Sequence, residues 1–170
     1  MLRIFVLSFA VLAAAGSTAI QAQGTTTMHK ISAALANELV GETVAQCTKN
    51  GYKVWAVVVD LDGVRQAVLR GDGAPIHSQD NAFYKAYTLA SMGPPRKETS
   101  TKQIADRMAK NPPSPVPVFP LPNITYAQGA LAIVANGEII GALGVSGAPG
   151  GQFDEDCARF ALDKVKDRLK

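Results

Sequence analysis

The sequence predicts an α/β domain of the α+β type, in which a mostly antiparallel five-stranded sheet has helices on its faces. Two pairs of apolar runs, 53–60 with 64–70 and 130–135 with 138–145, flank short turns that contain Asp62-Gly63 and Asn136-Gly137. Such dipeptides between apolar runs are typical of hairpins. Because hairpins join strands directly, without the helical crossover that parallel strands need, the sheet is expected to be antiparallel.

The first half of the chain should contain two helices around the first hairpin. Apolar residues recur at helical spacing over residues 29–49, where Thr27 can cap the start and Asn50-Gly51 supplies a left-handed stop. The run at 53–60 is apolar on both faces and predicts a central strand. A second helix is expected over residues 78–91 and ends at a Gly-Pro-Pro sequence.

The second half begins with a short helix and a proline-rich connection. Ser100 and Gln103 have capping-box spacing and predict a helix to about residue 110. Six prolines within residues 111–122 exclude a regular helix or a central strand. A surface linker is favoured there over a PxxP recruitment motif. Residues 121–126 are the candidate fifth strand, and the last helix is expected over 154–169, burying Cys157, Phe160, Ala161 and Val165.

The N-terminus has the pattern of a secretory signal peptide. A basic residue precedes an apolar run over 4–15 and a small, polar stretch that ends at Ala22. The run is too short for a spanning helix, so cleavage is favoured over a membrane anchor. We therefore expect a signal peptide at 1–22, a tether at 23–28 and a single domain at 29–170. The expected location is periplasmic or secreted, with no membrane span after cleavage.

Charge and cysteine content narrow the class further. The net charge of +3 is dispersed, without a basic stripe carrying aromatics, which argues against nucleic-acid binding. Cys47 and Cys157 are the two cysteines, one on each of the terminal helices. In an exported chain they predict one disulfide, although two buried free thiols are the alternative.

A glycine-rich bend follows the second hairpin and leads into the last helix. It contains Gly144, Ser146, Gly147, Gly150 and Gly151. No Lys and Ser/Thr follow its last glycine, so it is not a phosphate-binding loop of the Walker type. Backbone N–H groups at such a bend can bind a small anion. The alternative is a tight turn in which the glycines allow close packing.

Several side chains are candidates for chemistry. His77 follows a loop and could ligate haem iron, or be an ordinary exposed histidine. Lys85 lies among apolar residues and could bind an anion, form a Schiff base or simply extend to solvent. Asp154 and Glu155 could act as acid or base, or favour the positive end of the helix. No nucleophile with a partner base is evident, so no residue is assigned as catalytic.

Five segments in order resemble the GlcG/HbpS-like family, which is also called the haem-degrading domain family. They are WAVVVD at 55–60 with Gly63, RGDGA at 70–74, FYKAYT at 83–88, GEIIGALGVSG at 137–147 and DEDCA at 154–158. The resemblance implies a profilin-like three-layer α/β/α fold, with the first and last helices sharing one face. This placement would bring Cys47 towards Cys157. The resemblance also implies a homo-oligomer.

The resemblance also assigns site residues by position. Lys85 and Thr88 match the family's helix motif, and Gly144, Ser146 and Gly147 match its bend. Asp154 and Glu155 match its acidic pair, and His77 matches a histidine of one branch. Gln128-Gly129 departs from the usual double glycine.

These features predict an exported protein that binds haem or another tetrapyrrole. His77 would ligate iron, and Lys85 or the N–H groups near residues 146–151 would bind propionates. The alternatives are binding or turnover of a small organic acid, and a partner-binding oligomer without catalysis.

Overall fold

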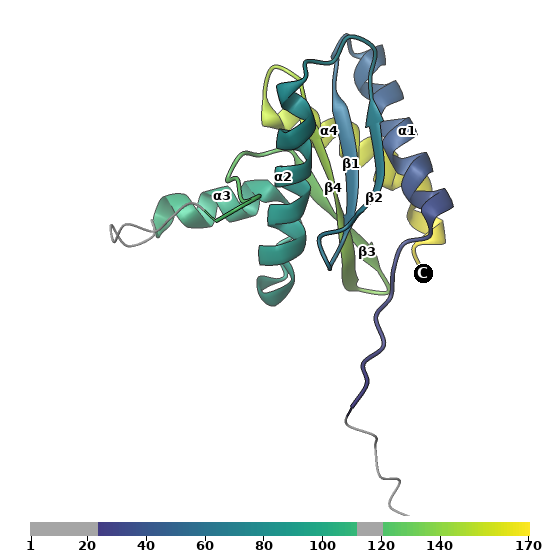
Figure 1. Ribbon diagram of the computed structural model, residues 1–170, viewed down its shortest axis with the longest axis vertical. Coiled ribbons are helices and arrows are strands. Elements are labelled where there is room, and N and C mark those ends of the chain that lie inside the picture. The colour runs from purple at the N-terminus through teal and green to yellow at the C-terminus, as the bar shows by residue number, and fades with distance from the viewer. Residues whose placement is uncertain (1–23, 112–120) are drawn as a thin grey trace, which may run out of the picture.

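The computed structural model describes residues 24–111 and 121–170. The expected signal peptide and most of the proline-rich connection lie outside these residues. Helices α1 (Ala33–Lys49) and α4 (Gly151–Val165) cover one face of the sheet, and α2 (His77–Met92) covers the other, with α3 (Thr101–Lys110) beside it (Figure 1). The three-layer α/β/α prediction is therefore confirmed. Among the described helices, none combines the length and the hydropathy needed to cross a membrane.

The sheet has the strand order β2-β1-β4-β3, and all its pairings are antiparallel. Its strands are β1 (Trp55–Asp60), β2 (Arg65–Arg70), β3 (Ala130–Ala135) and β4 (Glu138–Ser146). The two hairpins form as predicted, with Gly63, Asn136 and Gly137 in the left-handed region that tight turns require. Strands β1 and β4 pair at the centre, so the glycine-rich bend leaves the middle of the sheet.

The prediction of a fifth strand is wrong: four strands are present in the described residues. Residues 121–126 form a turn and an irregular segment instead. Pro122 has no N–H to donate, and Asn123 has a φ of 65° that interrupts an extended chain. The N–H of Thr125 donates to Oγ1 of Thr88 at 2.9 Å, so a side chain of α2 anchors this segment.

Two helix starts also differ from the sequence prediction. Ser32, and not Thr27, caps α1: its Oγ accepts the N–H of Leu35, and the chain before it is extended and places Ile31 in the core. Helix α4 begins at Gly151, three residues early, and a short 3₁₀ turn at Lys166–Arg168 follows it. The capping box of Ser100 and Gln103 at α3 is confirmed.

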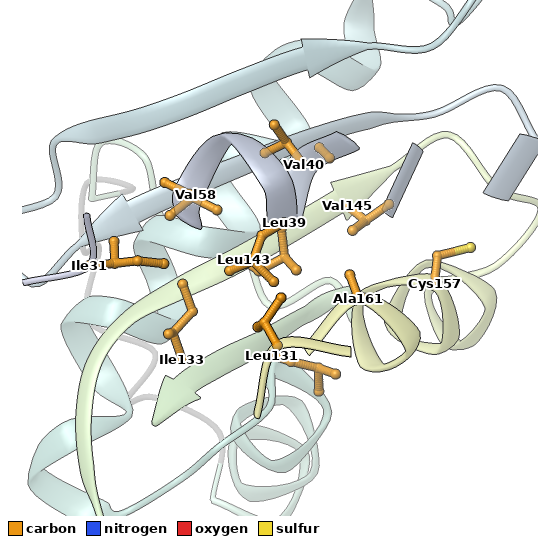
Figure 2. Packing of buried hydrophobic residues seen from close by; sticks show 14 of the residues in the cluster. Ile31, Leu39, Val40, Val58, Leu131, Ile133, Leu143, Val145, Cys157 and Ala161 are labelled. Carbon is orange, nitrogen blue, oxygen red and sulfur yellow. The ribbon is translucent and has the colours of Figure 1, made fainter. Parts of the chain in front are cut away.

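Buried side chains form one cluster on each face of the sheet. Leu39, Val58 and Leu143 lie in the cluster beneath α1 and α4 (Figure 2). Val57 and Leu89 belong to the cluster beneath α2. Adjacent residues of β1 thus point into different clusters, which explains why this strand is apolar on both faces.

The prediction that Phe160 of α4 is buried is wrong. Phe160 was expected in the core with Cys157, Ala161 and Val165, but its side chain is exposed, and Nζ of Lys164 lies 5.6 Å from its ring centroid. The step from Cys157 to Phe160 is close to one helical turn, and Phe160 falls just outside the buried stripe of the helix.

A disulfide joins the two helices on one side of the sheet. Cys47 of α1 and Cys157 of α4 are bonded, with their Cα atoms 5.5 Å apart, although they are 110 positions apart in sequence. This confirms the predicted disulfide and excludes the alternative of two free thiols. The crosslink holds the N-terminal and C-terminal helices of the domain together.

Candidate functional site

A cleft of about 460 Å³ lies where the glycine-rich bend leaves β4. Its walls come from the start of α2, the end of β4, the bend at 147–148, residues 127–128 and the start of α4. The residues that line it are Pro75, His77, Ser78, Asn81, Lys85, Ala127, Gln128, Ser146, Gly147, Ala148, Gly151 and Asp154. Six of the nine positions predicted from sequence to bind a ligand therefore line one cleft: His77, Lys85, Ser146, Gly147, Gly151 and Asp154.

Helix α2 presents a row of polar side chains to the cleft. His77, Asn81 and Lys85 follow one another at four-residue steps and line the cleft together. Residues four apart lie above one another on a helix, so this spacing forms a ladder from the exposed mouth to the interior. His77 is exposed at the start of the helix, whereas Lys85 is 3% exposed.

Lys85 and Asp154 form a buried ion pair on the cleft wall. Nζ of Lys85 donates to Oδ2 of Asp154 at 2.8 Å and to the carbonyl oxygen of Val145 at 2.9 Å. Burial raises the pKa of the Asp154 carboxyl above its ordinary value, although the charge and hydrogen bond of Lys85 act in the opposite direction. The interior thus resists the ionised form of this acid.

The glycine-rich bend is both closely packed and part of the cleft. A Cβ atom at Gly151 would clash with the carbonyl oxygen of Gln128, and one at Gly147 would clash with that of Lys53. Gly150 is the N-cap of α4, and its carbonyl oxygen accepts the N–H groups of Phe153 and Asp154. The glycines of the bend therefore allow close packing, and this packing places the first turn of α4 beside the cleft.

One N–H group of the bend already has an anionic partner. The N–H of Ala148 donates to Oδ1 of Asp154 at 3.1 Å. Asp154 thus occupies, from inside the chain, one of the positions that an anion at this bend would take.

Three of the sequence candidates do not line the cleft: Gly150, the N-cap of α4 described above, Thr88 and Glu155. Oγ1 of Thr88 anchors the segment at 121–126, as described above. Glu155 accepts hydrogen bonds from the backbone N–H of Lys102, from Oγ1 of Thr101 and, at 2.9 Å, from Nε2 of Gln128. Glu155 therefore links α4 to the start of α3 and fixes the side chain of Gln128 by a hydrogen bond.

Asn81 is a cleft residue that the sequence prediction missed, whereas Gln128 was expected from the resemblance to border the pocket and does line the cleft. Nδ2 of Asn81 donates to Oγ of Ser146 at 2.9 Å and so links α2 to the end of β4. The four-residue spacing of His77, Asn81 and Lys85 was the available signal for Asn81. For Gln128 the signal was its place in the family pattern, where Gln128-Gly129 stands for the usual double glycine.

The cleft residues suit a ligand that carries both a metal and carboxylates better than they suit a free metal ion. In the part of the chain that the structure describes, no three His, Cys, Asp or Glu side chains are grouped for metal binding. A single imidazole at the cleft is enough for haem, whose iron needs one or two protein ligands. Lys85 and Asn81 supply N–H donors of the kind that bind carboxylates.

Comparisons with known proteins agree with this fold. The family model described as "Haem degrading protein HbpS-like" matches residues 31–163. Comparison with curated proteins gives no match.

Among solved structures, a double mutant of Streptomyces reticuli HbpS is 29% identical, with a TM-score of 0.73 and coverage of 94% of this chain and 99% of that one. Protein ORFY of Klebsiella pneumoniae is 24% identical, with a TM-score of 0.72 and coverage of 84% and 95%. A PduOC:heme complex is 22% identical, with a TM-score of 0.67 and coverage of 79% and 94%. The last two likenesses show the fold alone.

The family match spans most of the described domain, and the predicted resemblance is confirmed. The chain belongs to the HbpS-like family of haem degrading proteins.

Proposed function

We propose that this protein binds haem or a related tetrapyrrole in the cleft between the starts of α2 and α4. The observation that carries the proposal is that His77 and Lys85 line one cleft from the same face of α2. An imidazole near the mouth and an ammonium in the interior match the two kinds of group, iron and propionate, that haem presents. Family membership supports the proposal, as does the presence of heme in the similar PduOC structure.

Each cleft residue has a separate role in this proposal. The imidazole of His77 would ligate iron, and Lys85 with the N–H groups at Gly147 and Gly151 would bind carboxylates. Pro75, Ala127 and Ala148 give the cleft some apolar wall, and the side chain of Ile76 is exposed beside His77. Bound haem would supply the redox-active iron. The protein residues would orient it, and we propose no catalytic step.

Titration with haemin tests the proposal directly. The wild-type protein should shift the Soret band, and His77→Ala should remove most of the shift. His29→Ala is the matched control, because His29 is the other histidine, is exposed and pairs with Glu138 away from the cleft. An unchanged spectrum with the wild type, or an equal loss in both variants, would contradict the proposal.

A small organic acid is the second candidate ligand. It is favoured by the polar character of the cleft, where Ser78, Asn81, Gln128 and Ser146 accompany the Lys85–Asp154 pair. Ligand pockets for large apolar molecules usually have more hydrophobic walls. A thermal-shift screen should distinguish the two, because a ligand that binds the native state raises Tm. Short carboxylates that raise Tm in wild type but not in Lys85→Met, with no effect of haemin, would favour this candidate.

Export and self-association complete the proposal. The Cys47–Cys157 disulfide supports export, because such bonds persist in oxidising compartments. Self-association rests on the family resemblance, and the assignment of residues 29–170 to one domain rests on the sequence pattern. Size-exclusion chromatography with light scattering would test the oligomer.

A further inference from the structure

Asp154 holds the position that a bound carboxylate would need. Its Oδ2 accepts from Nζ of Lys85 at 2.8 Å, and its Oδ1 accepts from the N–H of Ala148 at 3.1 Å. Both donors lie on the wall of the cleft, and both are donors that a ligand carboxylate would use. The carboxylate of Asp154 therefore already fills the place in which a ligand carboxylate would bind.

A ligand carboxylate at Lys85 would bring two carboxyl groups to one ammonium group. The side chains of Lys85 and Asp154 are only 4% and 3% exposed, so water screens their charges weakly. Two carboxylates that share one buried ammonium group cannot both remain ionised without a large penalty, so one of them takes up a proton. The ligand acid would be solvated at one end, whereas Asp154 is enclosed, so Asp154 is the group that becomes neutral.

We propose that the cleft binds a carboxylate ligand together with one proton, which Asp154 takes from solvent as it releases Nζ of Lys85 to the ligand. This inference rests on the proposed function, since it assumes that the ligand carries a carboxylate. The balance is simple: the ligand brings one negative charge, solvent supplies one proton to the Asp154 carboxylate, and Lys85 remains an ammonium ion. A protonated Asp154 can still accept from Ala148 and can donate its new O–H to the ligand.

The charged groups around Asp154 act in opposite directions, because Lys85 favours its ionised form and Glu155 disfavours it. Lys85 and His77 face the cleft from α2, and Glu155 is its neighbour on α4. Glu155 is turned away, with Thr101, Lys102 and Gln128 as its partners, but its charge also disfavours ionisation of Asp154. Burial raises the pKa of Asp154 even before a ligand arrives. His77 is present in both the wild type and Asp154→Asn, so the difference in proton uptake between these two proteins isolates Asp154.

Calorimetry in two buffers measures the proton. Haemin is titrated into the full mature protein at pH 7.5 in phosphate and in Tris, whose ionisation enthalpies differ, and the number of protons taken up follows from the difference in binding enthalpy. We expect the wild type to take up about one proton more than Asp154→Asn. The affinity of the wild type should also fall by up to about tenfold per pH unit above pH 7.5, whereas that of Asp154→Asn should fall less steeply.

Two controls identify the group. Asp156→Asn removes the same charge from an exposed position two residues along α4, and should retain the uptake. His29→Gln removes an exposed histidine that pairs with Glu138 away from the cleft, and should also retain the uptake. The wild-type measurement needs no substitution, so misfolding of a variant does not leave the proposal without a test.

The outcomes separate the two proposals. Haemin binding with equal proton uptake in wild type and Asp154→Asn, or with none in wild type, would overturn the proton inference and leave haem binding intact. If wild type binds no haemin, the proposed function fails and the same measurement is made with succinate. Uptake on binding succinate that is lost in Asp154→Asn would then support the inference, and no binding of succinate would overturn it.

Discussion

Nζ of Lys85 and Oδ2 of Asp154 meet at 2.8 Å, although the two residues are 69 positions apart and belong to helices on opposite faces of the sheet. The contact passes the end of β4, where Val145 contributes its carbonyl oxygen to the same ammonium. The sheet therefore does not separate its two helical layers at this point. The Lys85–Asp154 ion pair joins the two helical layers, and the cleft lies beside this ion pair.

Loss of Lys85 should destabilise the fold strongly. Lys85→Met leaves the Asp154 carboxylate buried without its cationic partner, and breaking a buried pair in this way typically costs about 3–5 kcal/mol. Urea unfolding monitored by circular dichroism measures the change. Lys102→Met is the control, because the exposed Lys102–Asp106 pair should contribute less than about 1 kcal/mol. Similar losses in the two variants would contradict the assigned burial.

Stability should depend on pH through Asp154 in a defined direction. Its folded-state pKa is raised by burial above the ordinary 3.8, so the folded protein binds this proton more tightly than the unfolded chain. That contribution is fully present below the unfolded pKa and is lost as pH rises through the folded pKa. The free energy of unfolding of the wild type, relative to Asp154→Asn, should therefore fall as pH increases from 3.5 and then level off. A difference that instead grows with pH would mean that the bond to Lys85 outweighs burial.

Removal of the disulfide should lower stability without removing the fold's topology. Cys47 and Cys157 are 110 positions apart in sequence, and in the chain-entropy model a loop of about this size contributes up to about 4.7 kcal/mol. Cys47→Ala/Cys157→Ala should lower the free energy of unfolding by about 2–5 kcal/mol. Reduction of the wild type should lower Tm, whereas the same reductant should leave Tm of the double variant unchanged.

Two glycines in different surroundings should respond oppositely to alanine. A Cβ atom at Gly144 of β4 would clash with the carbonyl oxygen of Ala82 and lie 2.9 Å from Cβ of Ala86, so Gly144→Ala should cost about 1–3 kcal/mol. Gly41 lies in α1 with open space around it, and Gly41→Ala should stabilise by about 0.5–1 kcal/mol. Destabilisation by both substitutions would contradict the close approach of α2 to β4.

Processing of the N-terminus tests the predicted signal peptide. If export removes residues 1–22, the mature chain begins at Gln23. Intact-mass spectrometry of protein recovered from a periplasmic extract, or from the medium, should give this N-terminus. Recovery of an intact Met1 from a membrane fraction would instead favour an uncleaved anchor.

The sheet was predictable where local turn chemistry determines it. Asp62-Gly63 and Asn136-Gly137 specify both hairpins, and the alternation of Val57 and Val58 between two cores explains the apolar central strand. The prediction of a fifth strand was wrong because residues 121–126 have the composition of a strand, whereas Pro122 and the left-handed Asn123 prevent pairing. Gly151 was left outside the last helix because glycine is a poor helix former. The helix nevertheless begins at Gly151, where no larger residue would fit against Gln128.

The candidate site was predictable in its residue types but not in its pairing. Lys85 and Asp154 both stand out in the sequence, yet nothing local shows that they bond across two layers. Asp154 and Glu155 look equivalent in sequence. A rotation of about 100° per residue points one to the cleft and the other to α3, so only the placement of the whole helix distinguishes them.

Cys157 follows Asp154 by less than one turn of α4, so the covalent link to α1 and the acid of the cleft are carried by the same short piece of helix. Reduction of this link would remove one restraint on the piece of α4 that carries Asp154, and the position of the cleft wall would then depend on packing and on the Lys85–Asp154 bond.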